Sequence, residues 1–147
     1  MRIPPPVITL ALALVMYCID YFGPAWLSLS GLAWLTGLFA FAALVFLLPA
    51  VGQFVRSDTT VNPHTPEKSS KLVVGGVYRF SRNPMYLGMA LALTAWACYL
   101  ENLLGYAFVF IFVSYMTRFQ IVFEEAALLE KFELEFEAYC KQVRRWL

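Results

Sequence analysis

Charged residues are scarce in this sequence. Asp, Glu, Lys and Arg make up only 14% of its 147 residues, and 61% are hydrophobic. Soluble domains carry about 25% charged residues, so this deficit excludes an ordinary soluble domain and indicates an integral membrane protein. The 11 basic and 10 acidic residues nearly cancel, with a formal net charge of +1. We therefore expect no nucleic-acid partner.

Residues that bind metals are also few. The chain has one histidine, His64, and three widely separated cysteines, Cys18, Cys98 and Cys140. A zinc site needs several such ligands at short, characteristic spacings, so we expect no metal site. The odd number of cysteines argues against a disulfide framework.

Four apolar runs dominate the sequence. A membrane-spanning helix needs about 20 apolar residues, a length that the first two runs reach comfortably and the last two only marginally. Glu101 and Asn102 alone separate the last two, which predicts a tight helical hairpin. The predicted fold class is all-α integral membrane, with about four transmembrane helices. The runs cover roughly residues 7–27, 29–55, 84–100 and 103–118.

Positive charge is absent from the two short connections at 28–30 and 101–102. Every Lys and Arg lies before the first run, between the second and third, or after the fourth. Basic residues are retained on the cytoplasmic side of membrane proteins, so both termini and the central loop are predicted to be cytoplasmic. We expect a multi-pass protein of a bacterial inner membrane.

The central loop, residues 56–82, is rich in Ser, Thr, Pro and Asn and predicts irregular structure. A loop of this length is usually functional or disordered, and its attachment to membrane helices at both ends favours function. We interpret residues 1–147 as one membrane domain. Residues 1–55 supply two transmembrane helices, and residues 56–147 form a cofactor-binding catalytic region.

The tail, roughly residues 120–146, has the pattern of an amphipathic helix. Its apolar residues recur at spacings near three and four and give one apolar face. We expect a cytoplasmic helix that packs on the protein or lies at the lipid headgroups. The apolar positions are Leu128, Leu129, Phe132, Phe136, Tyr139 and Val143.

Two polar motifs stand at the ends of the last two apolar runs. The segment GVYRFSRNPMYLG, from Gly76 to Gly88, places two arginines and two tyrosines around the start of the third run, and Glu124 and Glu125 follow the fourth. Ionised groups at the hydrocarbon edge are costly unless they are paired, hydrated or used. Anchoring of helices at the membrane interface is enough to explain the arginines and tyrosines of this segment. It does not explain why the polar loop, this cluster and the acidic pair share one edge.

The order of these motifs resembles that of the isoprenylcysteine carboxyl methyltransferase and phospholipid methyltransferase superfamily of integral-membrane enzymes. The resemblance implies methyl transfer from S-adenosyl-L-methionine to a membrane-embedded or lipophilic acceptor, at the cytoplasmic face and without a metal. It extends over roughly residues 56–146. It is carried by GVYRFSRNPMY, Leu87-Gly88, an apolar hairpin, Glu124-Glu125-Ala-Ala-Leu and the positions Phe132, Tyr139 and Val143-Arg144-Arg145-Trp146.

The resemblance also implies a set of site residues. Arg82, Tyr86 and Glu125 would be catalytic, and Arg118 would contact the substrate. Asn83 stands where the eukaryotic prenylcysteine enzymes have histidine, and an amide cannot act as a titrating base. The acceptor therefore stays open between prenylcysteine, phospholipid and other lipids. The cofactor would be bound by Ser70, Lys71, Leu72, Val73, Tyr78, Asn83, Pro84, Met85, Tyr86, Glu124 and Glu125.

The residue types suit this chemistry. A guanidinium pairs with a carboxylate through a planar fork, a glutamate accepts from an ammonium or from ribose hydroxyls, and a tyrosine face attracts a sulfonium. Two other functions stay open: an NADPH-dependent membrane reductase of the sterol reductase type, and a small four-helix transporter that would use Asp20 within the membrane. A structural membrane protein without catalytic activity is a third alternative.

Overall fold

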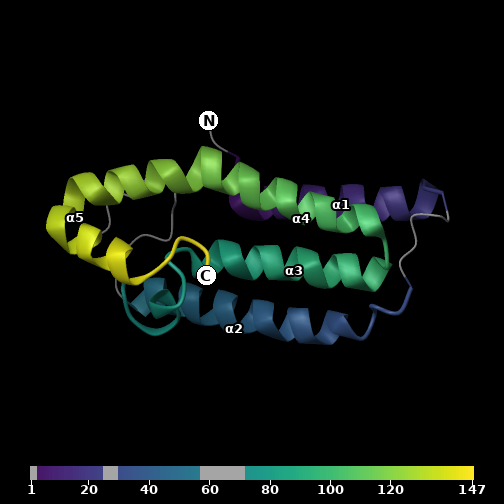
Figure 1. Cartoon of the computed structure of the whole chain (residues 1–147), viewed down its shortest axis with the longest axis horizontal. Helices are drawn as coiled ribbons and strands as arrows, with labels where there is room; N and C mark the ends of the chain where they lie inside the picture. The colour runs from purple at the N-terminus through teal and green to yellow at the C-terminus, as the bar shows by residue number, and fades with distance from the viewer. Residues whose placement is uncertain (1–2, 25–29, 57–71) are drawn as a thin grey trace.

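The chain forms a bundle of helices, which we describe from a computed structural model (Figure 1). The structure describes residues 3–24, 30–56 and 72–147, and no strand occurs among them. The predicted all-α membrane fold is confirmed. Its elements are α1 (Pro5–Phe22), α2 (Leu35–Arg56), a 3₁₀ turn (Gly76–Arg79), α3 (Pro84–Leu100), α4 (Leu103–Met116), a π-helical turn (Thr117–Ile121) and α5 (Val122–Gln142).

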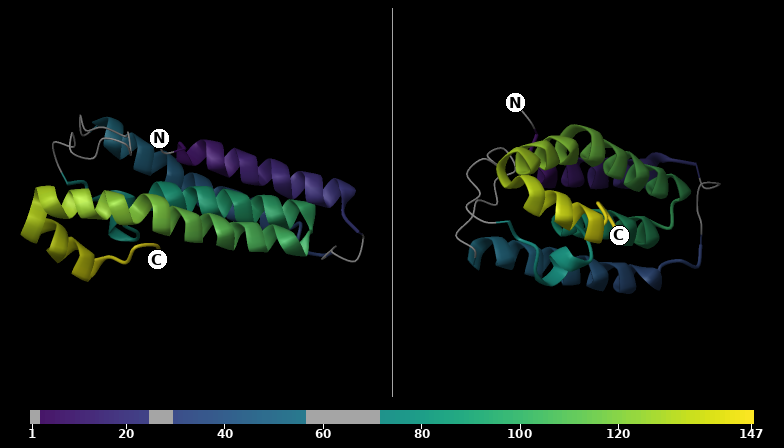
Figure 2. Two further views of the ribbon diagram at one scale, coloured as in Figure 1. Left: turned by 90° about the horizontal axis from the view of Figure 1, so that it is seen from above. Right: turned by 60° about the vertical axis from the view of Figure 1, so that its left-hand side comes forward.

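Among the residues that the structure describes, three helical stretches are long and apolar enough to cross a membrane: Pro5–Phe22, Leu35–Gln53 and the continuous Leu103–Gln142. The fourth, α3, has 17 residues. It lies in the middle of the bundle, with α2 on one side and α1 and α4 on the other (Figures 1 and 2). Only Glu101 and Asn102 separate α3 from α4, as the sequence predicted for a helical hairpin.

Helices α1 to α4 run alternately in opposite directions, so their termini gather at two ends of the bundle. We call the end that holds Pro5, Arg56, Pro84 and Met116 the loop end, and the opposite one the hairpin end. Helix α5 belongs to the loop end (Figure 2). The residues that come together at the loop end are therefore the candidates for a functional site.

At the hairpin end, Glu101 binds the backbone just before α2. Its carboxylate accepts hydrogen bonds from the backbone N–H groups of Gly31, Leu32 and Ala33, at 2.7, 3.0 and 3.2 Å. Gly31 has a φ of 94°, outside the helical region, and α2 starts at Leu35. The predicted start near residue 29 was wrong, because the apolar run is longer than the helix that it forms.

Asn102 completes the hairpin end. Its side-chain oxygen accepts from the backbone N–H of Leu104 at 3.1 Å and so caps α4. Its side-chain amide donates to Asp20 at 3.3 Å. Asp20, the residue that a transporter would use, is thus a partner of this cap near the end of α1.

Close packing against α3 relies on glycine. A Cβ atom at Gly88 would lie 3.0 Å from the Leu47 side chain and 3.1 Å from the backbone oxygen of Ala43, so α2 approaches α3 directly. A Cβ at Gly105 would lie 2.9 Å from the Ala97 side chain, so the glycine allows α4 to lie similarly close to α3. Small residues of this kind allow membrane helices to gain van der Waals contact.

Gly88→Ala is therefore expected to destabilise the bundle by about 1–3 kcal/mol, because a methyl group would press on the α2 backbone. Thermal unfolding in detergent measures the effect. Gly37→Ala is the matched control, since a Cβ there meets nothing within 4 Å. Equal unfolding temperatures for the two variants would contradict the close α2–α3 contact.

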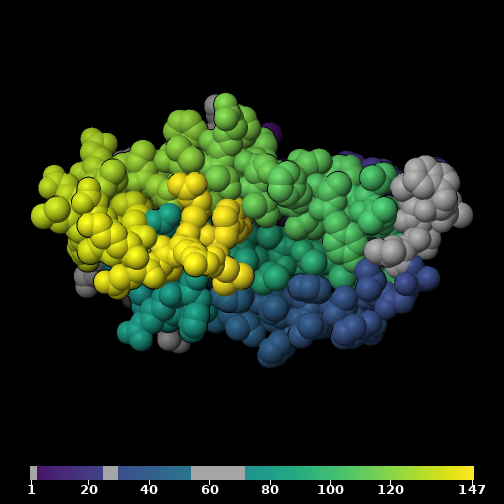
Figure 3. All heavy atoms as spheres, viewed as in Figure 1, coloured from purple at the N-terminus to yellow at the C-terminus, as the bar shows by residue number. Residues whose placement is uncertain are grey.

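The tail is a direct continuation of α4. The π turn joins α4 to α5 without a break and buries Gln120 and Ile121. Within α5, Glu133 has non-helical angles, φ 37° and ψ −113°, and the chain folds back beyond it (Figure 2). Helix α5 ends at Gln142, so the predicted helix end near residue 146 was wrong. Figure 3 shows the C-terminal segment lying over the residues that precede α3.

Candidate functional site

The C-terminal segment is tied to the corner that opens α3. The backbone N–H of Arg82 donates to the carbonyl of Arg144 at 3.0 Å. The Asn83 side-chain amide and the Ser81 hydroxyl donate to the carbonyl of Arg145, at 3.0 and 3.4 Å. Residues 143–147 bond to this corner instead of continuing the helix, which explains why α5 ends at Gln142.

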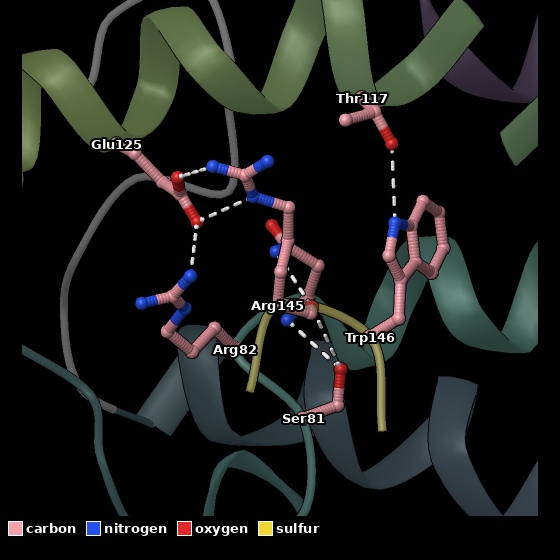
Figure 4. A network of polar contacts seen from close by, with 7 residues as sticks. Ser81, Arg82, Thr117, Glu125, Arg145 and Trp146 are labelled. Carbon is pink, nitrogen blue, oxygen red and sulfur yellow. Dashed lines mark hydrogen bonds and ion pairs between the residues drawn. The ribbon is translucent and has the colours of Figure 1, made fainter. Parts of the chain in front are cut away.

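Glu125 lies between two arginines (Figure 4). Arg145 approaches it through two atoms, Nε at 3.2 Å and Nη2 at 2.6 Å, and Arg82 contributes Nη2 at 3.0 Å. The exposed fractions of these side chains are 13% for Arg82, 17% for Glu125 and 37% for Arg145. Hydrogen bonding to Glu125 raises the pKa of Arg145, so the guanidinium stays charged.

Glu124 has different partners from its neighbour. The Tyr86 hydroxyl donates to its Oε1 at 2.7 Å, and the side-chain amide of Gln120 donates to the same oxygen. Tyr86 and Gln120 are both buried. The two consecutive glutamates therefore have different environments. Glu125 forms ion pairs with two arginines, whereas the two donors to Glu124 named here are neutral side chains.

Aromatic side chains cover the 3₁₀ turn beside this polar cluster. Tyr78 packs with Phe136 and Tyr139 from the folded-back half of α5, and the Tyr139 hydroxyl donates to the carbonyl of Tyr78 at 2.6 Å. Burial raises the pKa of the Tyr78 phenol, which therefore stays neutral. The partly buried residues Leu72, Val73, Val77, Met85, Leu128, Phe132 and Cys140 surround this cluster.

Trp146 anchors the last residues of the chain. Its indole N–H donates to the Thr117 hydroxyl at 3.1 Å (Figure 4). That hydroxyl donates to the carbonyl of Val113 at 2.7 Å. The contact joins the C-terminal segment to the π turn. Three segments far apart in sequence, at residues 81–86, 117–125 and 144–146, therefore meet at the loop end.

Six of the 13 predicted site residues lie at this meeting point. Arg82 contacts Glu125 and Tyr86 contacts Glu124, whereas Pro84 supplies the first turn of α3. Asn83 is attached to the C-terminal segment. Ser70 and Lys71 lie outside the described residues. Tyr78, Met85, Leu72 and Val73 belong to the adjoining aromatic cluster.

Arg118 is separate from the polar cluster. It is exposed, and its guanidinium carbon lies 5.9 Å from the centre of the Phe119 ring. Residues seven positions apart, such as Arg118 and Glu125, share a face only on a regular α-helix. The π turn ends at Ile121, between these two residues, and changes the register.

Sequence reasoning assigned no role to Gln120 or Arg145. Gln120 is a polar residue in an apolar stretch, a signal that could have marked it as buried and bonded. Arg145 belongs to the motif that supports the resemblance, but its partner Glu125 stands 20 positions earlier. No local pattern predicts that the chain folds back at Glu133 and becomes extended at Val143 to make this contact.

A shallow hollow of about 540 Å³ lies at the hairpin end, away from the polar cluster. Its lining is apolar and includes Leu14, Cys18 and Phe22 of α1 and Leu104 of α4. A lining of this kind suits contact with lipid chains and offers no charged group for a polar ligand.

Comparisons with known proteins supply independent findings. A family model described as phospholipid methyltransferase matches residues 33–135, which include the α3 corner and both glutamates. An uncharacterised protein of Haemophilus influenzae is 44% identical over 63 residues, which are 43% of this chain and the whole of that protein. No solved structure matches the chain.

Proposed function

Because the chain belongs to the phospholipid methyltransferase family, we propose that it transfers the methyl group of S-adenosyl-L-methionine to a lipophilic acceptor at the cytoplasmic membrane face. Membership makes it a membrane methyltransferase with a lipid-type substrate. The contact between Tyr86 and Glu124, beside the Arg82–Glu125 ion pair, carries the finer proposal.

The groups at the loop end fit the proposed cofactor. S-adenosylmethionine would supply an electrophilic methyl group on a sulfonium, together with an ammonium, a carboxylate and ribose hydroxyls. The Glu124 carboxylate suits a cation or a hydroxyl donor. A guanidinium such as that of Arg82 suits a carboxylate. Neutral tyrosine rings, here Tyr78 and Tyr86, suit a sulfonium.

The chain's own residues would act chiefly by positioning. Tyr86 and Gln120 hold the carboxylate of Glu124 from two sides, and the Arg82–Glu125 pair fixes the adjacent corner. The aromatic cluster around Tyr78 covers one flank and excludes water. Alignment of two reactants can lower a barrier by about 7–11 kcal/mol, so this methyl transfer requires neither a triad nor a metal.

Charge distribution supports the proposed cytoplasmic face. Every Lys and Arg of the sequence lies in segments connected to the loop end, and none lies in the short connections at the hairpin end. The polar cluster thus occupies the end that the positive-inside rule assigns to the cytoplasm. A water-soluble cofactor and a bilayer-soluble acceptor would meet there.

The other functions considered from the sequence are not favoured. A family of methyltransferases gives no support to a nicotinamide-dependent reductase or to a transporter. Separate calorimetric titrations of the purified protein with S-adenosylhomocysteine and with NADPH distinguish these functions. Binding of S-adenosylhomocysteine alone is expected. Binding of NADPH alone, or of neither ligand, would contradict the proposal.

Tyr86→Phe is expected to weaken S-adenosylhomocysteine binding roughly tenfold, because it removes one of the donors that orient Glu124. Calorimetry in detergent measures the dissociation constant. Tyr99→Phe serves as the control, since Tyr99 is 61% exposed and lies at the hairpin end of α3. Equal affinities of the two variants would remove Tyr86 from the cofactor site.

A further inference from the structure

Arg82 and Arg145 carry more hydrogen-bond donors than Glu125 accepts. Arg145 uses Nε and Nη2, and Arg82 uses only Nη2 towards this carboxylate. The Nε of Arg82 is buried and has no hydrogen-bond partner among the described residues. Buried donors without a partner are rare in folded proteins and often mark the place of a ligand.

The charge of the cluster indicates which ligand fits. Two guanidiniums share one carboxylate, and a buried charge is costly unless a counter-ion or hydrogen bonds compensate it. Glu124 directs its carboxylate to the donors of Tyr86 and Gln120. An additional oxyanion would satisfy the remaining donors of both arginines, since a planar guanidinium fork matches carboxylate and phosphate geometry.

We propose that Arg82 and Arg145 together form a binding site for an oxyanion, a carboxylate or a phosphate, which approaches from the more exposed side, that of Arg145. The identity of the oxyanion rests on the proposed function, because the two sources are the carboxylate of the cofactor and the phosphate of a lipid headgroup. Both sources also carry a cation in their zwitterionic forms, which Glu124 would receive.

The C-terminal segment holds this site in place before a ligand arrives. The carbonyls of Arg144 and Arg145 are bonded to the α3 corner, and Trp146 is bonded to Thr117 (Figure 4). Glu125 lies between the two guanidiniums and offsets their mutual repulsion. A site fixed in this way loses little freedom on binding, which favours affinity.

The test compares each anionic ligand with a neutral counterpart. Calorimetry measures S-adenosylhomocysteine against its decarboxylated analogue. Thermal unfolding in neutral detergent measures phosphatidic acid against diacylglycerol with the same chains. The wild-type protein is expected to prefer at least one anionic ligand by roughly tenfold to hundredfold, the range of a charge-assisted hydrogen bond.

Arg145→Gln is expected to abolish that preference, whereas Arg144→Gln keeps it. Arg144 is exposed and contributes only its backbone carbonyl to the cluster, so it is a matched control. Loss of the S-adenosylhomocysteine preference identifies the cofactor carboxylate as the source. Loss of the phosphatidic acid preference identifies a lipid phosphate.

An unchanged preference in Arg145→Gln would overturn the inference. If this variant fails to fold, the two comparisons on the wild-type protein still test the inference. Equal binding of the anionic and neutral ligands in both comparisons would also overturn the inference. The phosphatidic acid comparison contains no cofactor. An incorrect assignment of the cofactor would therefore be detected separately, because the protein would bind NADPH in place of S-adenosylhomocysteine.

Discussion

Glu124→Gln is expected to weaken S-adenosylhomocysteine binding by roughly tenfold to hundredfold and to abolish most methyl transfer. The variant keeps the size of the side chain and removes its charge. Tyr86 and Gln120 both donate to this carboxylate, and both are buried, so the fold orients a negative charge at this position. Charged hydrogen bonds of this kind contribute about 1.5–3 kcal/mol each.

Calorimetry and transfer of a labelled methyl group to extracted lipid measure these two effects. Glu130→Gln is the matched control, because Glu130 is an exposed residue of the same helix. The control is expected to bind and react like the wild-type protein. Full affinity in Glu124→Gln would show that this carboxylate does not contact the cofactor.

Glu125→Gln is expected to act mainly on stability. It removes the counter-ion of Arg82 and Arg145, of which Arg82 is largely buried. Removing one partner of a fully buried ion pair costs about 3–5 kcal/mol. Because Arg145 is partly exposed, we expect a smaller loss, about 2–3 kcal/mol, in the free energy of unfolding.

Denaturation in detergent measures this loss, with Glu137→Gln as the control on an exposed part of α5. We predict that Glu125 also supports cofactor affinity, through the positions of Arg82 and Arg145. A variant with wild-type stability would show that the three-residue ion cluster is not formed in solution. The two glutamate variants thus separate a ligand-contacting role from a scaffolding role.

Local sequence patterns predicted the helical bundle well, because hydrophobic length and charge asymmetry are local properties. Pro84 marked the first residue of α3, and the pair Glu101 and Asn102 marked the hairpin. The start of α2 was mispredicted, and the contact of Glu101 with backbone groups about 70 residues earlier in the chain was not predicted. No local signal contains that contact.

The sequence indicated which motifs come together at the loop end, but not how their side chains pair, and it gave no role to Gln120 or Arg145. Motif order associated the Arg82–Tyr86 corner with the acidic pair, and the structure brings these groups into contact. The pairing of Glu124 with Tyr86, and of Glu125 with the arginines, depends on the backbone conformation, which the sequence motifs did not reveal. The π turn adds one residue per turn immediately before α5, and a shift of one position rotates a helical side chain by about 100°.

A structure determined with S-adenosylhomocysteine bound tests the central claim most directly. We predict that the ligand lies at the loop end, with polar atoms within hydrogen-bond distance of Glu124 and with the Tyr86–Glu124 and Arg82–Glu125 contacts both present. A ligand bound elsewhere, for example in the apolar hollow beside Phe22 and Leu104, would contradict the account. A structure that separates Tyr86 from Glu124 across the bundle would contradict it equally.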